Sequence, residues 1–456
     1  MDRLPCVLTI AGSDSGGGAG IQADIKTISM LGGYAASVIT ALTAQNTKNV
    51  TGIHAPSSQF VAQQLLTVTE DIQIDAAKTG MLFSEPIIEA IAPLLRHKKY
   101  PLVVDPVCVA TSGAKLLKED AVDALIRLIF PCADILTPNI PEAEMFTGIK
   151  ISDREDVFRA ARILLDMGPH AVLIKGGHSQ SWAITDWFVA RDRDPIPFLQ
   201  QRVQTISTHG TGCTLSAAIA TGLAQGLEIE ATIKKAQEYL NLGLRASFPI
   251  GEGGGPPNHL APWLKVEARE KVLSDLNQFC RWLEASDGIA ALLPKGRGNI
   301  AISLPYAKDL SEVASMSGGI VGTHGGDALS VGFPDFGVSE RTGATLLAVQ
   351  RLNPEVGCAV TLGLTKKMKQ VLHLSDFESI WIKREGKPDY ISLEHGRFEE
   401  WGTFTILKEH KAPGIVEAIA DPGGYGYEPV LRLLAKDVGD LVEKMKKLFK
   451  ILKTLD

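Results

Sequence analysis

The chain has 456 residues, and its 46 lysines and arginines against 52 aspartates and glutamates give a formal net charge of −6. Hydrophobic residues at 45% and charged residues at 21% are typical of globular proteins and exclude a disordered or collagen-like chain. This length predicts two or three domains, each able to bury a core. The acidic balance disfavours a dedicated nucleic-acid-binding protein, and the basic stretch 444–450 is expected to be the solvated face of a terminal helix.

Neither a targeting segment nor a membrane span is expected. No apolar run approaches the roughly 20 residues that cross a bilayer, and a short apolar stretch leads from Arg3 straight to Gly12. The six cysteines are scattered without a CxxC pair, which disfavours structural disulfides and a zinc knuckle. We therefore expect a cytosolic protein with no membrane partner.

From the N-terminus to about residue 250, short apolar runs alternate with helical patterns. Segment 57–68 is one such helix, with a serine cap and Val61, Leu65 and Val68 on one face. The alternation predicts a parallel α/β sheet, in which ligands bind at the carboxyl ends of the strands. The runs expected to be strands buried on both faces are residues 6–10, 102–104, 134–136 and 171–174.

A run of glycine and proline at 249–258 cannot continue a helix and marks a boundary. Beyond it, 266–283 is predicted to be a helix, followed by short strands, glycine-rich turns and a final helix from about residue 430 to 455. This second half is expected to be a smaller α+β domain. The predicted organisation is therefore a domain at 1–262, a connecting segment at 263–274 and a domain at 275–456.

The first predicted strand runs into a glycine-dense segment from Gly12 to Asp24. Such a segment allows a backbone to approach a ligand closely. It lacks the Gly-Lys-Ser/Thr of a Walker A loop and is not a clean dinucleotide fingerprint. From these residues alone, a plain strand-to-helix turn is about as good an interpretation as a ligand loop.

A second motif, Thr208 to Thr214, precedes a helical run of small and apolar residues at 215–223. Free N–H groups and the positive end of the helix dipole would form an anion hole suited to a phosphoryl group in transfer. Cys213 would lie at that helix start, where thiol pKa values fall, and could act as a base on a substrate hydroxyl. The alternative is a buried cysteine that only packs.

Three polar side chains follow predicted strands of the first half. Asp105 and Glu142 carry the oxygen ligands that Mg²⁺ prefers, and Lys175 could meet ATP phosphates. Each taken singly could equally be a helix cap or a surface ion pair. Together with an anion hole they predict phosphoryl transfer.

Segments 11–27, 38–47 and 209–218 together closely resemble the hydroxymethylpyrimidine and phosphomethylpyrimidine kinases of thiamine biosynthesis, over residues 4–262. The resemblance implies a ribokinase-like three-layer α/β/α domain with a mostly parallel sheet, which uses ATP and Mg²⁺. The residues it implies at the substrate are Gly12, Asp24, Gln45, Met81 and Val107. Those it implies for catalysis are Gly210, Thr211, Gly212 and Cys213, with Lys175 and Thr208 at the nucleotide and Asp105 and Glu142 at the metal.

The implied activity is two successive ATP-dependent transfers, first to the hydroxymethylpyrimidine and then to its monophosphate, giving the diphosphate. Cys213 takes the place of an aspartate base found in many ribokinase relatives. A kinase for another hydroxymethyl heterocycle, such as pyridoxal, or for a sugar is the alternative within the class. Because such relatives often dimerise, a homo-oligomer is expected by analogy.

The second half carries phosphate-binding candidates among glycines and small hydroxyl residues: Arg297, Ser339 and Arg341. Tight turns with exposed arginines are an equally good interpretation, and His324 is more simply a structural histidine. Runs 304–307 and 336–339 resemble the ThiN-type thiamine-phosphate synthase, over residues 275–456.

That resemblance implies condensation of the pyrimidine diphosphate with thiazole phosphate and release of pyrophosphate. The chain departs from the family pattern, in which a histidine follows the Phe-Gly-x-Ser run and an arginine lies about a score of residues before it. Arg341 stands near the first place and Gly319-Ile320 near the second. A non-catalytic module that binds thiamine phosphate and regulates the kinase is therefore the alternative.

Overall fold

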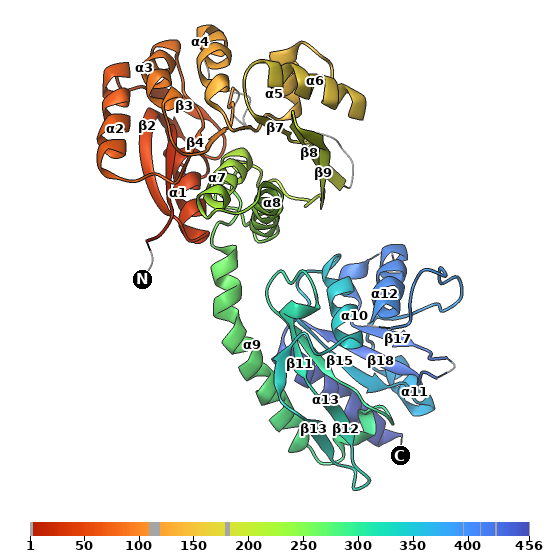
Figure 1. Cartoon of the computed structure of the whole chain (residues 1–456). Helices are drawn as coiled ribbons and strands as arrows, with labels where there is room; N and C mark the ends of the chain where they lie inside the picture. Colours follow the sequence, from red (N-terminus) through yellow and green to blue (C-terminus); the bar gives the residue numbers. More distant parts are fainter. Residues whose placement is uncertain are drawn as a thin grey trace. The chain divides into compact units, whose positions relative to one another are not determined.

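The protein is described here as a computed structural model that covers residues 3–108, 119–177, 183–394, 396–410, 412–424 and 426–455. The chain forms two compact units, Met1–Trp263 and Leu264–Asp456. Figure 1 shows the elements of both. The segment 263–274, expected to connect two domains, is part of a helix, α9 (Ala261–Glu284).

Within the described residues, nine strands of the first unit form one sheet in the order β3-β2-β1-β4-β5-β6-β7-β8-β9. Strands β2, β1, β4, β5, β6 and β7 are parallel, and β3, β8 and β9 are antiparallel to their neighbours. The strands are β1 (Cys6–Asp14), β2 (Tyr34–Gln45), β3 (Val50–His54), β4 (Ala76–Thr79), β5 (Leu102–Val104), β6 (Ile135–Leu136), β7 (Ala171–Ile174), β8 (Ala183–Ala190) and β9 (Arg193–Gln201).

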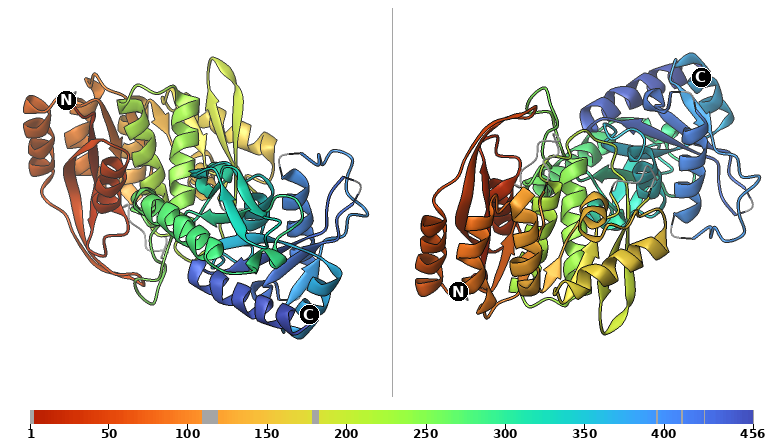
Figure 2. Two further views of the ribbon diagram at one scale, coloured as in Figure 1. Left: turned by 90° about the horizontal axis from the view of Figure 1, so that it is seen from below. Right: turned by 90° about the horizontal axis from the view of Figure 1, so that it is seen from above.

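Helices cover both faces of this sheet (Figure 2). The side chains of β1 alternate between the faces, so Leu8 packs with α2 and α3 while Val7 packs with α1, α7 and α8. The helices are α1 (Gly20–Met30), α2 (Ser58–Asp71), α3 (Glu85–Arg96), α4 (Glu119–Ala124), α5 (Ile140–Thr147), α6 (Arg154–Asp166), α7 (Thr211–Ala224) and α8 (Ile229–Arg245), with short π and 3-10 turns at Leu125–Ile129 and Phe130–Cys132. This confirms the predicted three-layer α/β/α fold.

The chain leaves β1 to form β2 on one side and then returns to form β4 on the other. The carboxyl ends of β2, β1 and β4 therefore diverge around a switch point, where open parallel sheets bind ligands. The loops after β1, β4, β5, β6 and β7 all emerge at this edge. Side chains that are far apart in the sequence can consequently meet there.

The second unit is an α+β structure, as predicted, with a mainly antiparallel sheet in the order β14-β11-β10-β15-β18-β17-β16 within the described residues. Helices α9, α11 and α13 pack on one face, and α10 and α12 on the other. The strands are β10 (Ile300–Ser303), β11 (Val313–Met316), β12 (Gly319–Gly322), β13 (Ala328–Val331), β14 (Pro334–Phe336), β15 (Cys358–Gly363), β16 (Ser379–Trp381), β17 (Ala418–Asp421) and β18 (Val430–Ala435). The helices after α9 are α10 (Arg341–Gln350), α11 (Lys366–Leu374), α12 (Arg397–Glu409) and α13 (Val438–Thr454), with 3-10 turns at Ile289–Leu292, Leu310–Glu312 and Pro413–Ile415.

The prediction of one helix from 430 to 455 is wrong in its first part. Residues 430–435 form β18 between β15 and β17, and α13 starts only after Asp437, whose side chain accepts a hydrogen bond from the N–H of Asp440. The apolar run of β18 is buried on both faces of the sheet, so its periodicity could not separate strand from helix. Among the described residues, no helix is both long and apolar enough to span a bilayer. All six cysteines are free thiols.

Candidate active site

A cavity of about 670 Å³ opens at the carboxyl edge of the first unit's sheet. Its walls come from the end of β2, from the segments that follow β1, β4, β5, β6 and β7, and from the start of α7. Of the residues predicted for the site of the first unit, those that line it are Gly12, Gln45, Met81, Asp105, Val107, Glu142, Lys175, Thr208, Gly210, Thr211, Gly212 and Cys213. Asp24 is the exception.

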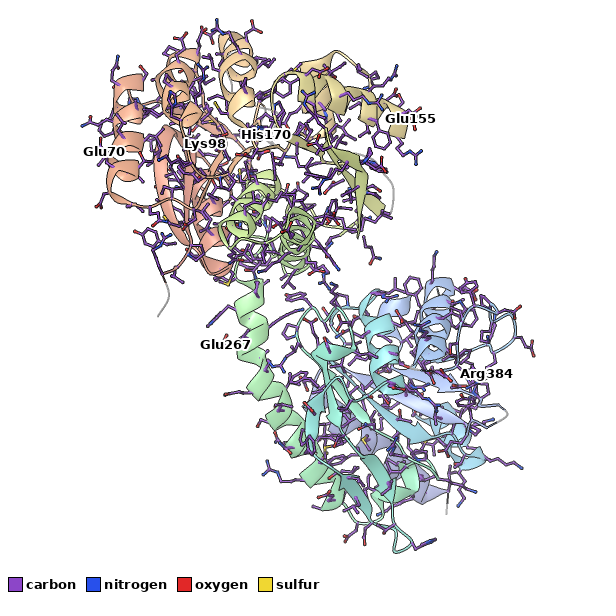
Figure 3. All side chains as sticks on the ribbon, viewed as in Figure 1. Glu70, Lys98, Glu155, His170, Glu267 and Arg384 are labelled. Carbon is purple, nitrogen blue, oxygen red and sulfur yellow. The ribbon has the colours of Figure 1, made fainter. Side chains whose placement is uncertain are left out.

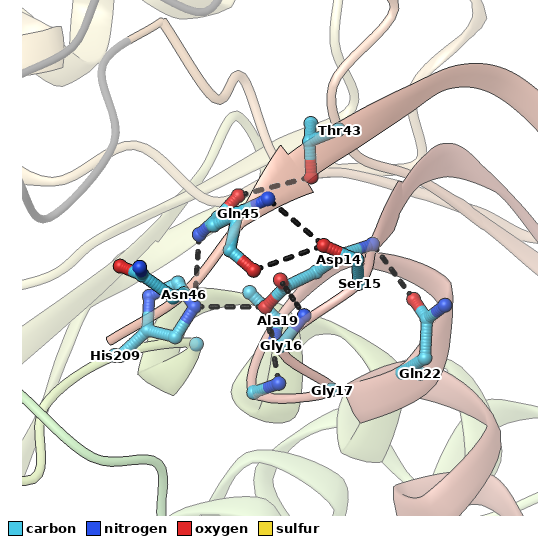
Figure 4. Close-up of polar contacts among 12 residues, drawn as sticks. Asp14, Ser15, Gly16, Gly17, Ala19, Gln22, Thr43, Gln45, Asn46 and His209 are labelled. Atoms are coloured by element: carbon cyan, nitrogen blue, oxygen red, sulfur yellow. Dashed lines mark hydrogen bonds and ion pairs between the residues drawn. The ribbon is translucent and has the colours of Figure 1, made fainter. Parts of the chain in front are cut away.

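The glycine-dense loop after β1 is wrapped around the carboxylate of Asp14 (Figure 4). Its Oδ1 accepts a hydrogen bond from the N–H of Gly16 (2.8 Å), and its Oδ2 accepts from Gly18 (3.0 Å) and Ala19 (2.8 Å). Burial alone would raise the pKa of Asp14, but the hydrogen bonds from His209 and from Gly16 and Ala19 hold that pKa below its ordinary value. The loop is thus an anchored turn with an ionised carboxylate at its centre.

His209, which sequence reasoning left without a role, joins this turn to the cavity wall. Its Nε2 lies 2.9 Å from Oδ2 of Asp14 and 3.2 Å from Nε2 of Gln45. Because an ionised carboxylate can only accept, Nε2 of His209 carries the hydrogen. The NH₂ of Gln45 therefore has no acceptor at that nitrogen, while its Oε1 accepts from the Thr43 hydroxyl (3.2 Å). The position of His209 directly before Gly-Thr-Gly-Cys was the signal that could have found it.

The prediction that Asp24 touches a substrate differs from the structure. Asp24 lies on α1 and is fully buried, as is Lys78 of β4. The Nζ of Lys78 donates to both carboxylate oxygens over 3.2 Å, and the Thr9 hydroxyl donates to Oδ2 over 2.6 Å. Burial raises the pKa of Asp24, against the lowering effect of Lys78. Asp24 is therefore a sealed ion-pair partner beneath the cavity.

Helix α7 begins against the loop that follows β1. Gly210 has a φ of +76°, and a Cβ there would lie 2.0 Å from the carbonyl oxygen of Gly18, so only glycine permits this approach. The Thr214 hydroxyl donates to the Gly210 carbonyl (2.9 Å) and consequently accepts from Nε2 of His259 (3.0 Å). Burial lowers the pKa of His259 to about 4. A neutral histidine thus braces the start of the helix.

Cys213 lies in the first turn of α7, partly exposed to the cavity. The expected lowering of its thiol pKa is wrong for this structure. Burial raises the pKa of Cys213 to about 11, because the opposing effect of Lys78 is smaller and the carboxylates of Asp24 and Asp105 favour the thiol. The rise in the pKa of Cys213 caused by desolvation is therefore larger than the fall expected from the helix dipole.

The three polar side chains predicted at strand ends do meet. The Nζ of Lys175 donates to Oδ1 of Asp105 over 2.9 Å, and Gly212 of α7 lies so close that a Cβ there would be 3.2 Å from Oδ2 of Asp105. Glu142 also forms a capping box with Asn139 at the start of α5. Both interpretations of these residues, structural and functional, are therefore compatible with their positions.

Charge at this end of the cavity is strongly coupled. Although burial favours the neutral amine, the carboxylates of Asp105 and Glu142 raise the pKa of Lys175. Burial raises the pKa of Glu142 to about 7; Lys175 opposes this and Asp105 adds to it. Sequence reasoning missed Asp186 of β8, which lines the same end and accepts from the N–H of Gly176 over 2.8 Å. His178, three positions after Lys175, lies outside the described residues.

At the opposite end, Gly12 and Met81 are in contact, since a Cβ on Gly12 would lie 2.6 Å from the terminal methyl of Met81. The Thr40 hydroxyl fixes the Met81 backbone by donating to its carbonyl over 2.6 Å. Val107 follows Asp105 in the next loop, and its N–H donates to the Asp105 carbonyl (2.9 Å). The cavity thus has an apolar end beside Gln45 and a charged end beside Lys175.

In the second unit the three phosphate-binding candidates are placed differently from one another. Arg341 opens α10, and the buried Ser339 accepts from the N–H of Gly343 over 3.3 Å. Arg297 lies across Gly319 and points its Nη1 to the Gly318 carbonyl, 3.5 Å away. His324 lies exposed in the turn between β12 and β13. Of these four residues, Arg341 alone makes ion-pair contacts among the described residues, with Glu399.

A three-layer sheet fold with a lysine, two carboxylates and a helix N-terminus around one cavity defines a ribokinase-like small-molecule kinase that uses ATP. Residues 14–258, more than half of the chain, match the family model of phosphomethylpyrimidine kinase. The chain belongs to that family. Residues 275–447 match the family model of thiamine-phosphate synthase ThiN.

Similar proteins agree with this assignment. The hydroxymethylpyrimidine/phosphomethylpyrimidine kinase of Rhizobium meliloti is 48% identical over 262 residues, which are 57% of this chain and 98% of that protein. The thiamine biosynthesis bifunctional protein ThiED of Geobacter sulfurreducens is 50% identical over 256 residues, 56% of this chain, and the chain spans about half (52%) of that protein's length.

Solved structures of pyridoxal kinases share the fold of the first unit. The ADP complex of the Bacillus subtilis enzyme has a TM-score of 0.53 at 32% identity and covers 57% of this chain and 100% of its own. The Staphylococcus aureus enzyme in complex with AMP-PCP and pyridoxal has a TM-score of 0.52 at 30% identity, covering 57% of this chain and 95% of its own.

Proposed function

We propose that the first unit transfers the γ-phosphoryl group of ATP to hydroxymethylpyrimidine and then to the resulting monophosphate. The observation that carries this proposal is the two-ended cavity, in which Gln45 and Met81 form one end and the Lys175–Asp105 pair beside Gly212 forms the other. A small heterocycle at the first end would point its substituent toward the start of α7. The kinase family match supports the same reaction.

The amide of Gln45 suits an aminopyrimidine. Its NH₂ has no acceptor at His209 and can donate to a ring nitrogen, while its oxygen can accept from an exocyclic amine. A site built to pair both partners discriminates strongly against a ring that lacks them. This contact supports a pyrimidine over pyridoxal, the substrate of the structural neighbours.

The first transfer forms a bond between the substrate oxygen and the γ-phosphorus, breaks the bond to ADP and releases the hydroxyl proton to Cys213. Because its pKa is raised to about 11, the thiol must first release its own proton to water. The hydroxyl proton of the substrate then restores the thiol. The monophosphate is already ionised at neutral pH, with a second pKa near 6. The second transfer therefore needs far less help from Cys213.

Mg²⁺ fits the charged end of the cavity by its donor set. Among the described residues, no group of three or more histidine, cysteine or acidic side chains could hold a metal alone, but Asp105 and Glu142 offer two carboxylates. Mg²⁺ commonly takes one or two carboxylates and completes its shell with water and substrate phosphates. When bound, the ion would neutralise charge on the phosphates, and Lys175 and the N–H groups of α7 would orient them.

For the second unit we propose condensation of the pyrimidine diphosphate with thiazole phosphate to thiamine phosphate, with release of pyrophosphate. The match to the ThiN family model over residues 275–447 supports this step. The two units would then catalyse consecutive reactions. The competing proposal, a module that binds thiamine phosphate without catalysis, follows from the departure near Arg341.

One reaction tests both proposals. Purified full-length protein is incubated with hydroxymethylpyrimidine, Mg-ATP and thiazole phosphate, and ADP, pyrimidine phosphates and thiamine phosphate are separated by chromatography. We expect ADP and thiamine phosphate. Accumulation of pyrimidine diphosphate without thiamine phosphate would refute the synthase, and absence of ADP would refute the kinase. A parallel reaction with pyridoxal should be much slower. Homo-oligomerisation and a cytosolic location remain predictions.

A further inference from the structure

Three arginines and two acidic residues from four elements and the loop after β16 meet on the α10/α12 face of the second unit's sheet. Arg341 opens α10, Arg384 follows β16 and Arg432 lies in β18. Glu399 of α12 and Asp421 at the end of β17 are their ion-pair partners. Figure 3 labels Arg384 beside these strands. We call these five residues the arginine cluster.

The arginine cluster carries more positive than negative charge around a buried centre. Three guanidinium groups face two carboxylates, a surplus of one positive charge. The exposed fraction of the side chain is 3% for Arg432, 2% for Asp421 and 4% for Glu399. The surplus charge belongs to Arg341, whose side chain is half-exposed, because Arg384 and Arg432 already pair with Asp421 and Glu399. Burial and the neighbouring Arg341 and Arg384 lower the pKa of Arg432, although Glu399 and Asp421 oppose this.

The two carboxylates of the arginine cluster differ in how well they are hydrogen-bonded. Arg384 grips Asp421 with two bonds of 2.9 and 2.8 Å, and the N–H of Gly423 adds a third of 3.0 Å. Glu399, by contrast, has only loose contacts through Oε1, at 3.4 Å from Arg432 and 3.6 Å from Arg341. Charge-assisted bonds are normally 2.7–2.9 Å long.

Unused donors remain at the buried arginine. Among the described residues, Nε and Nη1 of Arg432 have no hydrogen-bond partner, and neither does Oε2 of Glu399. Nη1 of Arg432 comes no closer than 3.9 Å to Asp421. Buried donors of native proteins are generally paired, and exceptions call for an explanation such as an absent ligand.

Arg341 connects this buried centre with solvent. Its side chain is 52% exposed, and its guanidinium lies 4.6 Å above the ring of Tyr427. The Arg384 guanidinium lies 5.5 Å from the same ring and 4.6 Å from that of Phe398. Stacking on aromatic faces orients the guanidinium planes. Nε and Nη2 of Arg384 stay bonded to Asp421, whereas the N–H edge of Arg341, held only by a 3.6 Å contact with Glu399, is available to an anion.

We propose that the arginine cluster binds the phosphate group of a phosphorylated ligand of the second unit, and that Arg341 exchanges the carboxylate of Glu399 for that phosphate. The inference rests on the proposed function in assigning a phosphate ester to this unit. A phosphate ester with one to two negative charges offsets the surplus positive charge. Its oxygens accept from the guanidinium edges in the paired geometry typical of arginine and phosphate. The N-terminus of α10, where Arg341 lies, adds a favourable dipole.

Calorimetric titration of the full-length protein tests this inference. The probes are thiazole phosphate, thiamine phosphate, inorganic phosphate and the unphosphorylated thiazole alcohol. For Arg341→Gln we expect at least ~10-fold weaker binding of the phosphorylated ligands, the loss of one charge-assisted contact, and no change for the alcohol. Arg351→Gln is the matched control, because Arg351 is also an arginine of this unit but pairs with Glu400. It should bind all probes like the wild type.

Two comparisons separate a failed inference from a failed function. Binding of phosphate esters that weakens in Arg341→Gln supports the arginine cluster even if no thiamine phosphate forms. Equal binding by Arg341→Gln and wild type, or no binding of any phosphorylated probe by the wild type, overturns it whichever products form. Kinase turnover and the melting curve of each variant show that the chain is folded. Arg384→Lys, which keeps the positive charge but loses the paired N–H donors of the guanidinium group, should also weaken phosphate binding.

Discussion

The sealed ion pair beneath the cavity gives the most direct test of the structure. We consider Lys78→Met, which keeps the length of the side chain and removes its charge. Asp24 would then hold a fully buried carboxylate with one remaining hydrogen bond, from the Thr9 hydroxyl. Removing one partner of a buried ion pair costs about 3–5 kcal/mol of the free energy of unfolding. The double variant Lys78→Met/Asp24→Asn keeps an acceptor for Thr9 and should recover more than half of that loss.

The pH dependence of the single variant follows from the same burial. Without Lys78, the pKa of Asp24 is raised further by desolvation. A carboxyl whose folded-state pKa is raised contributes stability below its unfolded pKa, and that contribution is lost as pH rises through the folded value. Lys78→Met should therefore be less destabilised at pH 5 than at pH 8.

Scanning calorimetry of the full chain provides the measurement, with the transition of the first unit identified by its shift on adding Mg-ATP. A loss below about 1 kcal/mol for Lys78→Met, or a double variant as unstable as the single one, would refute the reasoning. The double variant also examines the role of Asp24. Because the structure places Asp24 outside the cavity, the KM of the double variant for hydroxymethylpyrimidine should stay close to that of the wild type. A greatly raised KM would restore the expectation of a direct substrate contact.

Three further predictions concern the cavity of the first unit. Cys213→Ala should lower kcat for hydroxymethylpyrimidine by at least about two orders of magnitude, but kcat for the monophosphate by less than about tenfold. ADP release measured with each substrate gives both values. Equal losses would contradict the role of Cys213 as a proton acceptor. The pKa of His259 is depressed to about 4 from 6.5, so this residue contributes about 3 kcal/mol to the free energy of unfolding above pH 6.5, a contribution that is lost as pH falls through 4. In calorimetry, the free energy of unfolding of His259→Gln should lack this dependence on pH. Gly18→Ala would place a Cβ 2.5 Å from the ring of His209 and should raise KM for the pyrimidine severalfold. Gly52→Ala, whose Cβ would make an ordinary 3.8 Å contact with the Cβ of Ala44, should not.

Sequence reasoning placed much of the site because of one topological regularity. Asp105 and Lys175 are 70 positions apart, yet each directly follows a parallel strand, and parallel strands end at one edge. The Gly-Thr-Gly-Cys run likewise located the start of α7 and the thiol of Cys213. Patterns of this kind constrain the backbone, and the backbone then brings the side chains together.

Other features depend on contacts that no local pattern contains. Asp24 follows a glycine-rich loop and looks like a ligand, but only the packing of α1 on β4 reveals Lys78 beneath it. His209 meets Asp14 across 195 positions. The arginine cluster assembles residues from four elements and a loop, and β18, which carries Arg432, was predicted as part of a helix. The pKa of Cys213 also depends on burial, which the helix-start argument could not weigh.

A protonated thiol in the resting active site has a consequence for the chemical durability of the enzyme. Oxidants and alkylating agents react with thiolates, and a thiol of pKa about 11 is ionised in only about one molecule in ten thousand at pH 7. The raised pKa therefore protects Cys213 from peroxide and electrophiles, even though the residue lines a cavity. Such a residue resists oxidative inactivation, which an active-site cysteine of low pKa does not.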